Sequence, residues 1–327
     1  VVFNLLDEFS GIPSYDHYVV AYLELIRQRY TGCNPRGLML SRDKVLTKQL
    51  LAWHRIATPA FHLFPFGERF TEPKNLNFPL FVKSATLDAS YGIAQASVVE
   101  SFVGTGWANR LTGITLFKGA RLMLSRRILG DSGFVSLTDQ AEIGEGASLV
   151  AATLALGGRD TRLDGELELA GEGAYAEAAG ALLARGRQRH DVNLVVRHLV
   201  PNGTSRQLWR SVADDKAACS VAARVEVARH AQKTDGEQSL KGLLLSRSAT
   251  INAKPELEIF ADDVKCAHGA TVGELDRAAL FYLESRGVTP DEAKGLLTRA
   301  FVADALDRIG EERVREAFYA DAEGWFG

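Results

Sequence analysis

The stretch Val221-Ala222-Ala223-Arg224-Val225-Glu226-Val227 places an apolar residue at every second position. Because successive side chains of an extended strand point to opposite faces, this period of two predicts a β-strand with one buried face. The same alternation recurs at 122–124, 167–169 and 257–259. Short strands separated by Gly-rich turns are therefore predicted throughout 101–272. A β-sandwich, a β-barrel and a β-solenoid all fit this spacing, and the period alone does not choose among them.

The composition differs on either side of this β-rich segment. Six of the nine prolines precede residue 100, and 25 of the 30 glycines follow it. The first hundred residues combine helical spacing with short apolar runs at Val1–Leu6 and Phe78–Val82, which predicts an α/β segment. Near the end of the chain the period is helical again, and Thr289 followed by Glu292 has the capping-box spacing. We therefore predict three parts, which are 1–100, 101–272 and 273–327.

Charge and cysteine content exclude several classes of function. A net charge of −3 and a pI near 6.2 do not provide the basic stripe that binds nucleic acid. No apolar run is long enough to cross a bilayer and no basic–apolar leader occurs at Val1, so we expect a cytoplasmic protein without membrane contact. The three scattered cysteines fit a reducing compartment better than a disulfide framework. Cys33 and Cys219 have no neighbouring ligand residue and are predicted to be structural.

The candidate chemistry is concentrated at Cys266-Ala267-His268. A thiolate and a neutral imidazole both bind iron, and their i, i+2 spacing on a strand points both side chains to one face. Two ligands are too few for a cluster, so the others would come from a partner chain or from inorganic sulfide. The alternative is a small buried cysteine beside a hydrogen-bonded histidine. Asp262-Asp263 would point to opposite faces of a strand, which favours a turn over a metal pair.

A set of motifs follows in order along the second half of the chain. They are Thr204-Ser205-Arg206, Ala231-Gln232-Lys233-Thr234-Asp235, Leu243-Leu244-Leu245-Ser246, Lys254-Pro255-Glu256-Leu257-Glu258-Ile259, Asp262 to Gly273, and Phe281 to Gly287. With these motifs the sequence, from about Ser101 and most clearly from Asp191, resembles the SufB/SufD family of iron–sulfur cluster assembly scaffolds. The last two motifs favour the SufD branch.

This resemblance implies a right-handed parallel β-helix followed by C-terminal helices, and a scaffold that is not an enzyme. It implies that an edge of the β-helix pairs with a SufB-like subunit, that the C-terminal helices dock on the SufC ATPase, and that a homodimer can form when SufB is absent. It also implies a transient iron–sulfur cluster shared with the partner near His268, with Cys266 as a second ligand. ATP would act only through SufC.

Several segments of the first hundred residues carry a second resemblance. They are Phe3-Asn4-Leu5-Leu6, Thr31-Gly32, Leu40 to Lys44 with Lys48, Phe81-Val82-Lys83, and Asp88 to Ile93. In this order they resemble the D-alanine–D-alanine ligase branch of the ATP-grasp enzymes.

In that family the lysines that match Lys48 and Lys83 face nucleotide phosphates, as suits a compact ammonium charge. Ser84 departs from the family's proline, and the magnesium-binding carboxylates that phosphoryl transfer requires do not follow. The alternative function is therefore an inactive ligase fragment fused to the scaffold. For the two lysines themselves, a position as solvated surface residues is favoured over ATP binding.

Overall fold

A computed structural model shows two compact units, Val1–Ala94 and Gln95–Gly327, and each is considered by itself. The larger unit contains two sheets in which every strand pair is parallel. No helix in the described part of the chain is both long and apolar enough to cross a membrane. The residues that the structure describes are 1–4, 15–63, 95–130 and 133–326.

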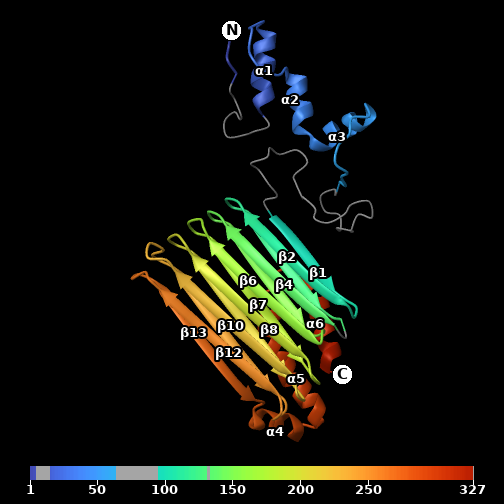
Figure 1. Cartoon of the computed structure of the whole chain (residues 1–327), viewed down its shortest axis with the longest axis vertical. Coiled ribbons are helices and arrows are strands. Elements are labelled where there is room, and N and C mark those ends of the chain that lie inside the picture. The colour runs from blue at the N-terminus through green and yellow to red at the C-terminus, as the bar shows by residue number, and fades with distance from the viewer. Residues whose placement is uncertain (5–14, 64–94, 131–132, 327) are drawn as a thin grey trace. The chain divides into compact units, whose positions relative to one another are not determined.

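The two sheets form a parallel β-helix of about six turns, because consecutive strands alternate between them (Figure 1). This confirms the predicted β-helix and excludes the sandwich and the barrel. In spatial order, the seven-stranded sheet contains β1 (Gln95–Phe102), β3 (Arg121–Ile128), β5 (Ser148–Ala155), β7 (Tyr175–Ala184), β9 (Thr204–Ala213), β11 (Asp235–Leu244) and β13 (Lys265–Glu274). The six-stranded sheet contains β12 (Thr250–Ile259), β10 (Ala218–Val227), β8 (Arg189–His198), β6 (Asp160–Leu169), β4 (Phe134–Ile143) and β2 (Trp107–Leu116).

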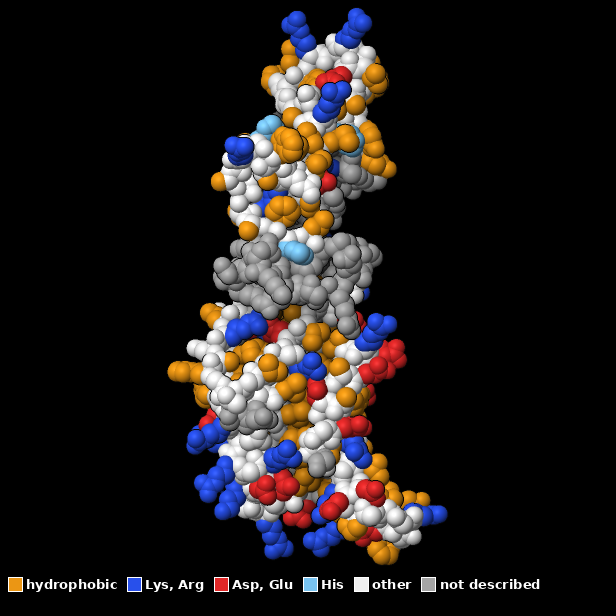
Figure 2. All heavy atoms as spheres, turned by 90° about the vertical axis from the view of Figure 1, so that its right-hand side faces the viewer, with side chains coloured by type: hydrophobic (Ala, Val, Ile, Leu, Met, Phe, Trp, Pro, Cys, Tyr) orange, Lys and Arg blue, Asp and Glu red, His pale blue; other side chains and the backbone are white. Residues whose placement is uncertain are grey.

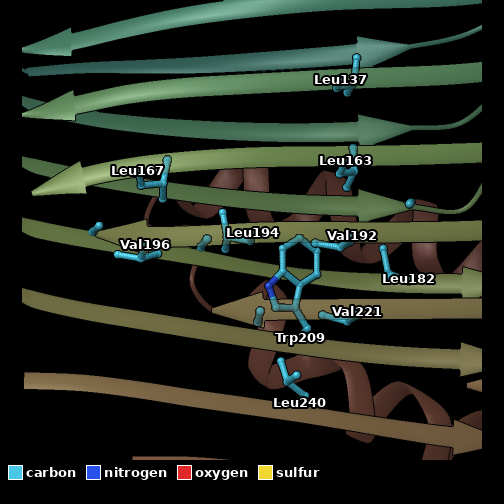
Figure 3. Packing of buried hydrophobic residues seen from close by; sticks show 14 of the residues in the cluster. Leu137, Leu163, Leu167, Leu182, Val192, Leu194, Val196, Trp209, Val221 and Leu240 are labelled. Carbon is cyan, nitrogen blue, oxygen red and sulfur yellow. The ribbon is translucent and has the colours of Figure 1, made fainter. Parts of the chain in front are cut away.

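The core lies between the two sheets, where every second residue of each strand points inward. In-register pairing stacks these residues into columns, such as the one that runs through Leu137, Leu163, Val192 and Val221. Figure 3 shows the side chains of this column among strands whose arrows point in opposite directions, with Trp209 beside them. The Val221 stretch that predicted a strand is β10, and its alternate residues are buried as expected.

Two glycines are required where backbones or rings approach closely. A Cβ atom at position 180 would lie 2.3 Å from Cζ3 of Trp209, so Gly180 makes room for the indole inside the β-helix. A Cβ atom at position 157 would lie 2.1 Å from the carbonyl oxygen of Gly130, where one turn stacks on the turn before it. Glycine at these positions therefore permits the tight stacking of successive turns.

The C-terminal helices are α4 (Arg277–Ser285), α5 (Pro290–Leu306) and α6 (Glu312–Phe326). Val302 of α5 and Phe318 of α6 join one apolar cluster with outward residues of the seven-stranded sheet, including Leu183. Ion pairs reinforce this packing, because Arg210 donates to Asp304 at 2.9 Å and Arg127 donates to Asp321 at 2.7 Å. The capping box predicted at the start of the second C-terminal helix is present at the start of α5.

In the N-terminal unit the described residues form three short helices, α1 (Asp16–Leu25), α2 (Pro35–Arg42) and α3 (Lys44–Trp53). A strand was predicted at Val1–Leu6, and its described residues form an isolated parallel bridge between Val2 and Tyr30. Leu5 and Leu6 lie outside the described residues. The strand predicted at Phe78–Val82 lies outside the described residues altogether.

Two histidines are buried inside the β-helix in the neutral form. Nε2 of His190 donates to the Gly157 carbonyl at 3.1 Å, and Nε2 of His198 lies 2.8 Å from the Ser205 hydroxyl. Desolvation lowers the pKa of each imidazole to about 4, since burial penalises the charged form. Both rings are fully buried, so they must remain uncharged while the protein is folded.

We therefore expect the β-helix to lose stability as the pH falls from 7 toward 4. The unfolded chain binds protons at each histidine near pH 6.5, whereas the folded chain does so only near pH 4, so protonation favours the unfolded state. Each histidine then costs roughly 2 kcal/mol of unfolding free energy at pH 5 relative to pH 8. Urea denaturation at both pH values measures this difference. The His198→Gln variant should show a smaller difference, while the exposed His230→Gln control should match wild type. An unchanged difference in His198→Gln would contradict the assignment.

Candidate functional site

Cys266 and His268 lie in the first half of β13, the last strand of the seven-stranded sheet. This strand pairs with β11 on one side, and the described part of the chain provides no strand on the other. Both residues occupy inward positions, because the i, i+2 spacing keeps them on the face that bears Leu240 and Trp209 in the preceding strands. Cys266 is half-buried and His268 is exposed. The structure therefore brings the two predicted residues together at an open end of the β-helix.

The thiol of Cys266 packs against the end of the apolar core. It contacts a cluster that includes the buried Val225 and the half-buried Leu257. Its register partner on β11 is Gly236, where an added Cβ atom would lie 3.3 Å from Sγ of Cys266 and 3.6 Å from Oγ of Ser205. Glycine at this position leaves the thiol room inside the open turn.

Burial raises the pKa of the Cys266 thiol, and the Gly236 backbone amide opposes that shift by hydrogen bonding to the sulfur. The thiol is consequently protonated at neutral pH. Because only the thiolate binds a metal, ligation at this site must release a proton.

His268 has a polar neighbour that the sequence analysis missed. Its register partner on β11 is Gln238, which is 1% exposed and whose Nε2 and Oε1 atoms have no hydrogen-bond partner. Next along the same inward column is Gln207 of β9. The signal was present in the sequence, since glutamine interrupts the alternating apolar pattern in two successive turns, but the spacing did not reveal that the two residues align.

The acidic candidates of the larger unit do not join this pair. Asp262 and Asp263 are exposed in the turn between β12 and β13, and Asp263 forms an ion pair with Lys233, so the turn interpretation is confirmed. Lys48 donates to the carbonyl of Pro59 at 2.8 Å. Lys83 lies outside the described residues.

The free cysteines differ in burial. Cys219 is a fully buried inward residue of β10, where desolvation raises its pKa to about 12, whereas Cys33 is exposed. Within the described ranges, no three acidic, histidine or cysteine side chains gather in a way that could hold a metal ion. Cys266 and His268 therefore provide an incomplete ligand set.

A second cysteine and histidine lie in register inside the β-helix, because Cys219 of β10 is the partner of His190 of β8. The sequence analysis missed this neighbour of Cys219. Both side chains are fully buried, so this pair does not share the open position of Cys266 and His268. On the face of the β-helix in view in Figure 2, basic and acidic side chains are mixed. Opposite charges also pair on the outer face of the six-stranded sheet, where Nε of Arg197 lies 2.6 Å from Oε2 of Glu226. An interior cavity of about 50 Å³ is lined in part by Arg126 and Trp209, and none of its lining residues belongs to β11, β12 or β13.

Comparison with known proteins gives this geometry a context. Residues 90–301 match the family model described as the SufBD core domain of the SUF system of FeS cluster assembly. The chain belongs to the SufBD family. The matched segment covers every strand of the β-helix, including the Cys266 and His268 pair, together with α4 and most of α5. The first 89 residues lie outside it.

Individual SufBD relatives agree with this assignment. The chain is 31% identical to the iron-sulfur cluster assembly protein SufD of Escherichia coli over 72% of its own length and 56% of the relative. It is 31% identical to the SufBD family protein slr0076 of Synechocystis, over 71% of the chain and 54% of the relative. It is 28% identical to the chloroplastic protein ABCI7 of Arabidopsis thaliana, over 68% and 48%. The chain thus spans about half the length of the curated relatives it matches.

The raised pKa of Cys266 can be tested by alkylation. We expect the rate of iodoacetamide labelling at Cys266 to rise steeply from pH 7 and still to be rising at pH 9, because the thiolate fraction grows with pH until the raised pKa is passed. Peptide mass spectrometry after timed quenching follows each cysteine separately. Cys219 serves as the internal control and should remain unlabelled while the protein is folded. A Cys266 rate that levels off below pH 8 would contradict the raised pKa.

Proposed function

We propose that this chain is a SufD-like scaffold subunit of iron–sulfur cluster assembly, which holds a transient cluster rather than catalysing a reaction. Membership of the SufBD family, together with a thiol and an imidazole side by side at an open strand, carries the proposal. Thiolate and imidazole are both ligands of iron–sulfur centres. In this proposal the cluster is the material being assembled and not a resident cofactor of the protein. The proposal also places the protein in the cytoplasm.

The partner on this side is a SufB-like subunit that pairs along β13 or β12. Both are edge strands at the same end of the β-helix, and an edge strand presents unpaired backbone groups to another chain. A partner at this edge can add the missing ligands to Cys266 and His268. Without a SufB-like subunit, a second copy of this chain has the same edge to offer, which would give a homodimer.

The SufC ATPase docks on the C-terminal helices in this proposal, and ATP acts only there. The apolar residues of this region divide into two groups. Leu306 is buried and Phe301 is half-buried against the sheet, whereas Phe281, Tyr282 and Leu296 are 72%, 59% and 43% exposed. Phe281 and Tyr282 lie on α4 and Leu296 lies on α5, and large apolar side chains that remain exposed on helices are typical of a docking surface.

The N-terminal segment contributes a separate prediction. Its resemblance to the D-alanine–D-alanine ligases rests on sequence motifs, and the hydrogen bond from Lys48 to Pro59 equally fits a surface lysine. We therefore treat residues 1–100 as a fused segment without ligase activity, and assign Lys48 and Lys83 no role in the scaffold.

Replacing His268 should separate cluster assembly from complex formation. In cells that coexpress SufB and SufC, the His268→Ala variant should copurify with both partners but yield about tenfold less cluster, because a ligand is lost at the surface without disturbing the core. Iron and sulfide content and the visible absorbance of the purified complex measure the yield. The exposed His230→Ala variant is the matched control. Wild-type cluster content in His268→Ala would remove this residue from the proposal, and failure of the wild-type chain to copurify with either partner would sink the scaffold function.

The helix surface can be tested independently of the cluster. We expect the double variant Phe281→Ser, Tyr282→Ser to lose SufC while retaining SufB, because it removes apolar contact area from α4 and leaves the β-helix edge intact. Copurification on a tagged SufB-like subunit distinguishes the two contacts. Trp107→Ser replaces a comparably exposed aromatic residue on β2 and should retain both partners. Retention of SufC by the double variant would place the docking surface elsewhere.

A further inference from the structure

The inward column that ends at His268 contains two buried glutamines whose amide groups are incompletely bonded. Gln207, Gln238 and His268 occupy equivalent positions on the adjacent strands β9, β11 and β13. Oε1 of Gln207 and both amide atoms of Gln238 have no hydrogen-bond partner, although each residue is only 1% exposed. A buried polar atom without a partner costs about 1–3 kcal/mol of stability, so three in succession point to a role outside the core.

Strand spacing places these side chains within reach of one another, although no hydrogen bond joins them in the structure. Adjacent strands lie about 4.8 Å apart, and residues in register project to the same side. The terminal torsion of a glutamine side chain has a broad range, so each amide can turn toward its neighbour at little cost. The column can therefore form a continuous chain of hydrogen bonds.

One contact assigns the amide atoms of Gln207. Nε2 donates to the backbone carbonyl of Arg224 at 3.0 Å, because a carbonyl can only accept. Oε1 of Gln207 is therefore an acceptor, it has no partner, and Gln238 is its register neighbour. The arrangement that satisfies this acceptor turns the NH₂ group of Gln238 toward Gln207 and the Oε1 of Gln238 toward His268. In that arrangement the imidazole nitrogen nearest Gln238 is a donor.

We propose that Gln238 is a positioning residue that fixes the tautomer of His268, with Gln207 as the anchor that orients Gln238. The inward ring nitrogen carries the proton and the other nitrogen keeps its lone pair for a metal at the open end. Such a hydrogen bond on the second nitrogen orients a ligating histidine and raises its basicity. This inference rests on the proposed role of His268 as a cluster ligand, but it concerns a property of the isolated chain.

The tautomer can be measured directly by NMR. In the full-length chain labelled with ¹⁵N-histidine, long-range ¹H–¹⁵N spectra at pH 8 should show a single tautomer for His268, identified by its absence in His268→Ala. Gln238→Met keeps the volume of the side chain and removes both amide atoms, so His268 should become a mixture of both tautomers. Gln207→Met frees Gln238 to turn over and should also give a mixture.

Controls separate positioning from simple packing. Glu237→Gln alters the outward neighbour on β11 and should leave the single tautomer unchanged. Urea unfolding of Gln238→Met should still show one cooperative transition, so that the change of tautomer is observed in a folded β-helix. A mixture of tautomers in wild type, or an unchanged single tautomer in Gln238→Met, would overturn the inference. The tautomers of wild type and of the glutamine variants can behave as expected while His268→Ala keeps the cluster content of wild type. That result would refute the ligand role of His268 and would leave the hydrogen-bond chain intact.

Discussion

In-register stacking of parallel strands is the constraint on which the rest of this molecule depends. Each residue lies over its equivalent in the preceding turn, so one inward position is repeated through a whole sheet. The side chains of an apolar column such as Leu137, Leu163, Val192 and Val221 then lie over one another, and each fully buried side chain contributes about 1.5–3 kcal/mol. A slip of one residue would turn the column to solvent, so burial itself enforces the register.

Polar residues in the inward columns are informative because the same register limits their partners. Arg126 is buried but bonds to both carboxylate oxygens of Asp139, at 2.8 Å and 3.1 Å, and to Glu100 at 2.9 Å. His198 has Ser205 as its partner. Among the described residues, Gln238 is the one side chain with two buried atoms that have no hydrogen-bond partner. Its register neighbour on the end strand β13 is the exposed His268. Its position is thus explained better by His268 than by the core.

Sequence reasoning predicted the features that are written into single strands. The alternation around Val221 located β10, and the i, i+2 spacing correctly placed Cys266 and His268 on one face, since both depend on local geometry alone. The alignment of Gln207, Gln238 and His268 depends on the lengths of the turns between their strands, which no local period encodes. For the same reason the sequence could not separate exposed Phe281 from buried Leu306, because helical spacing does not show which face meets the sheet.

The end position of the site follows from the same stacking. A further strand over β13 would bury Cys266 and His268, as Gly236 and Gln238 are buried on β11, the next strand of the sheet. An unpaired edge leaves both ligands reachable and leaves backbone groups for an added strand. A strand from another chain that continued the sheet would place its own inward residues in the columns of Cys266 and His268. Pairing of the edge and completion of the ligand set would then be one event, and the register of the added strand would decide which residues meet the cluster.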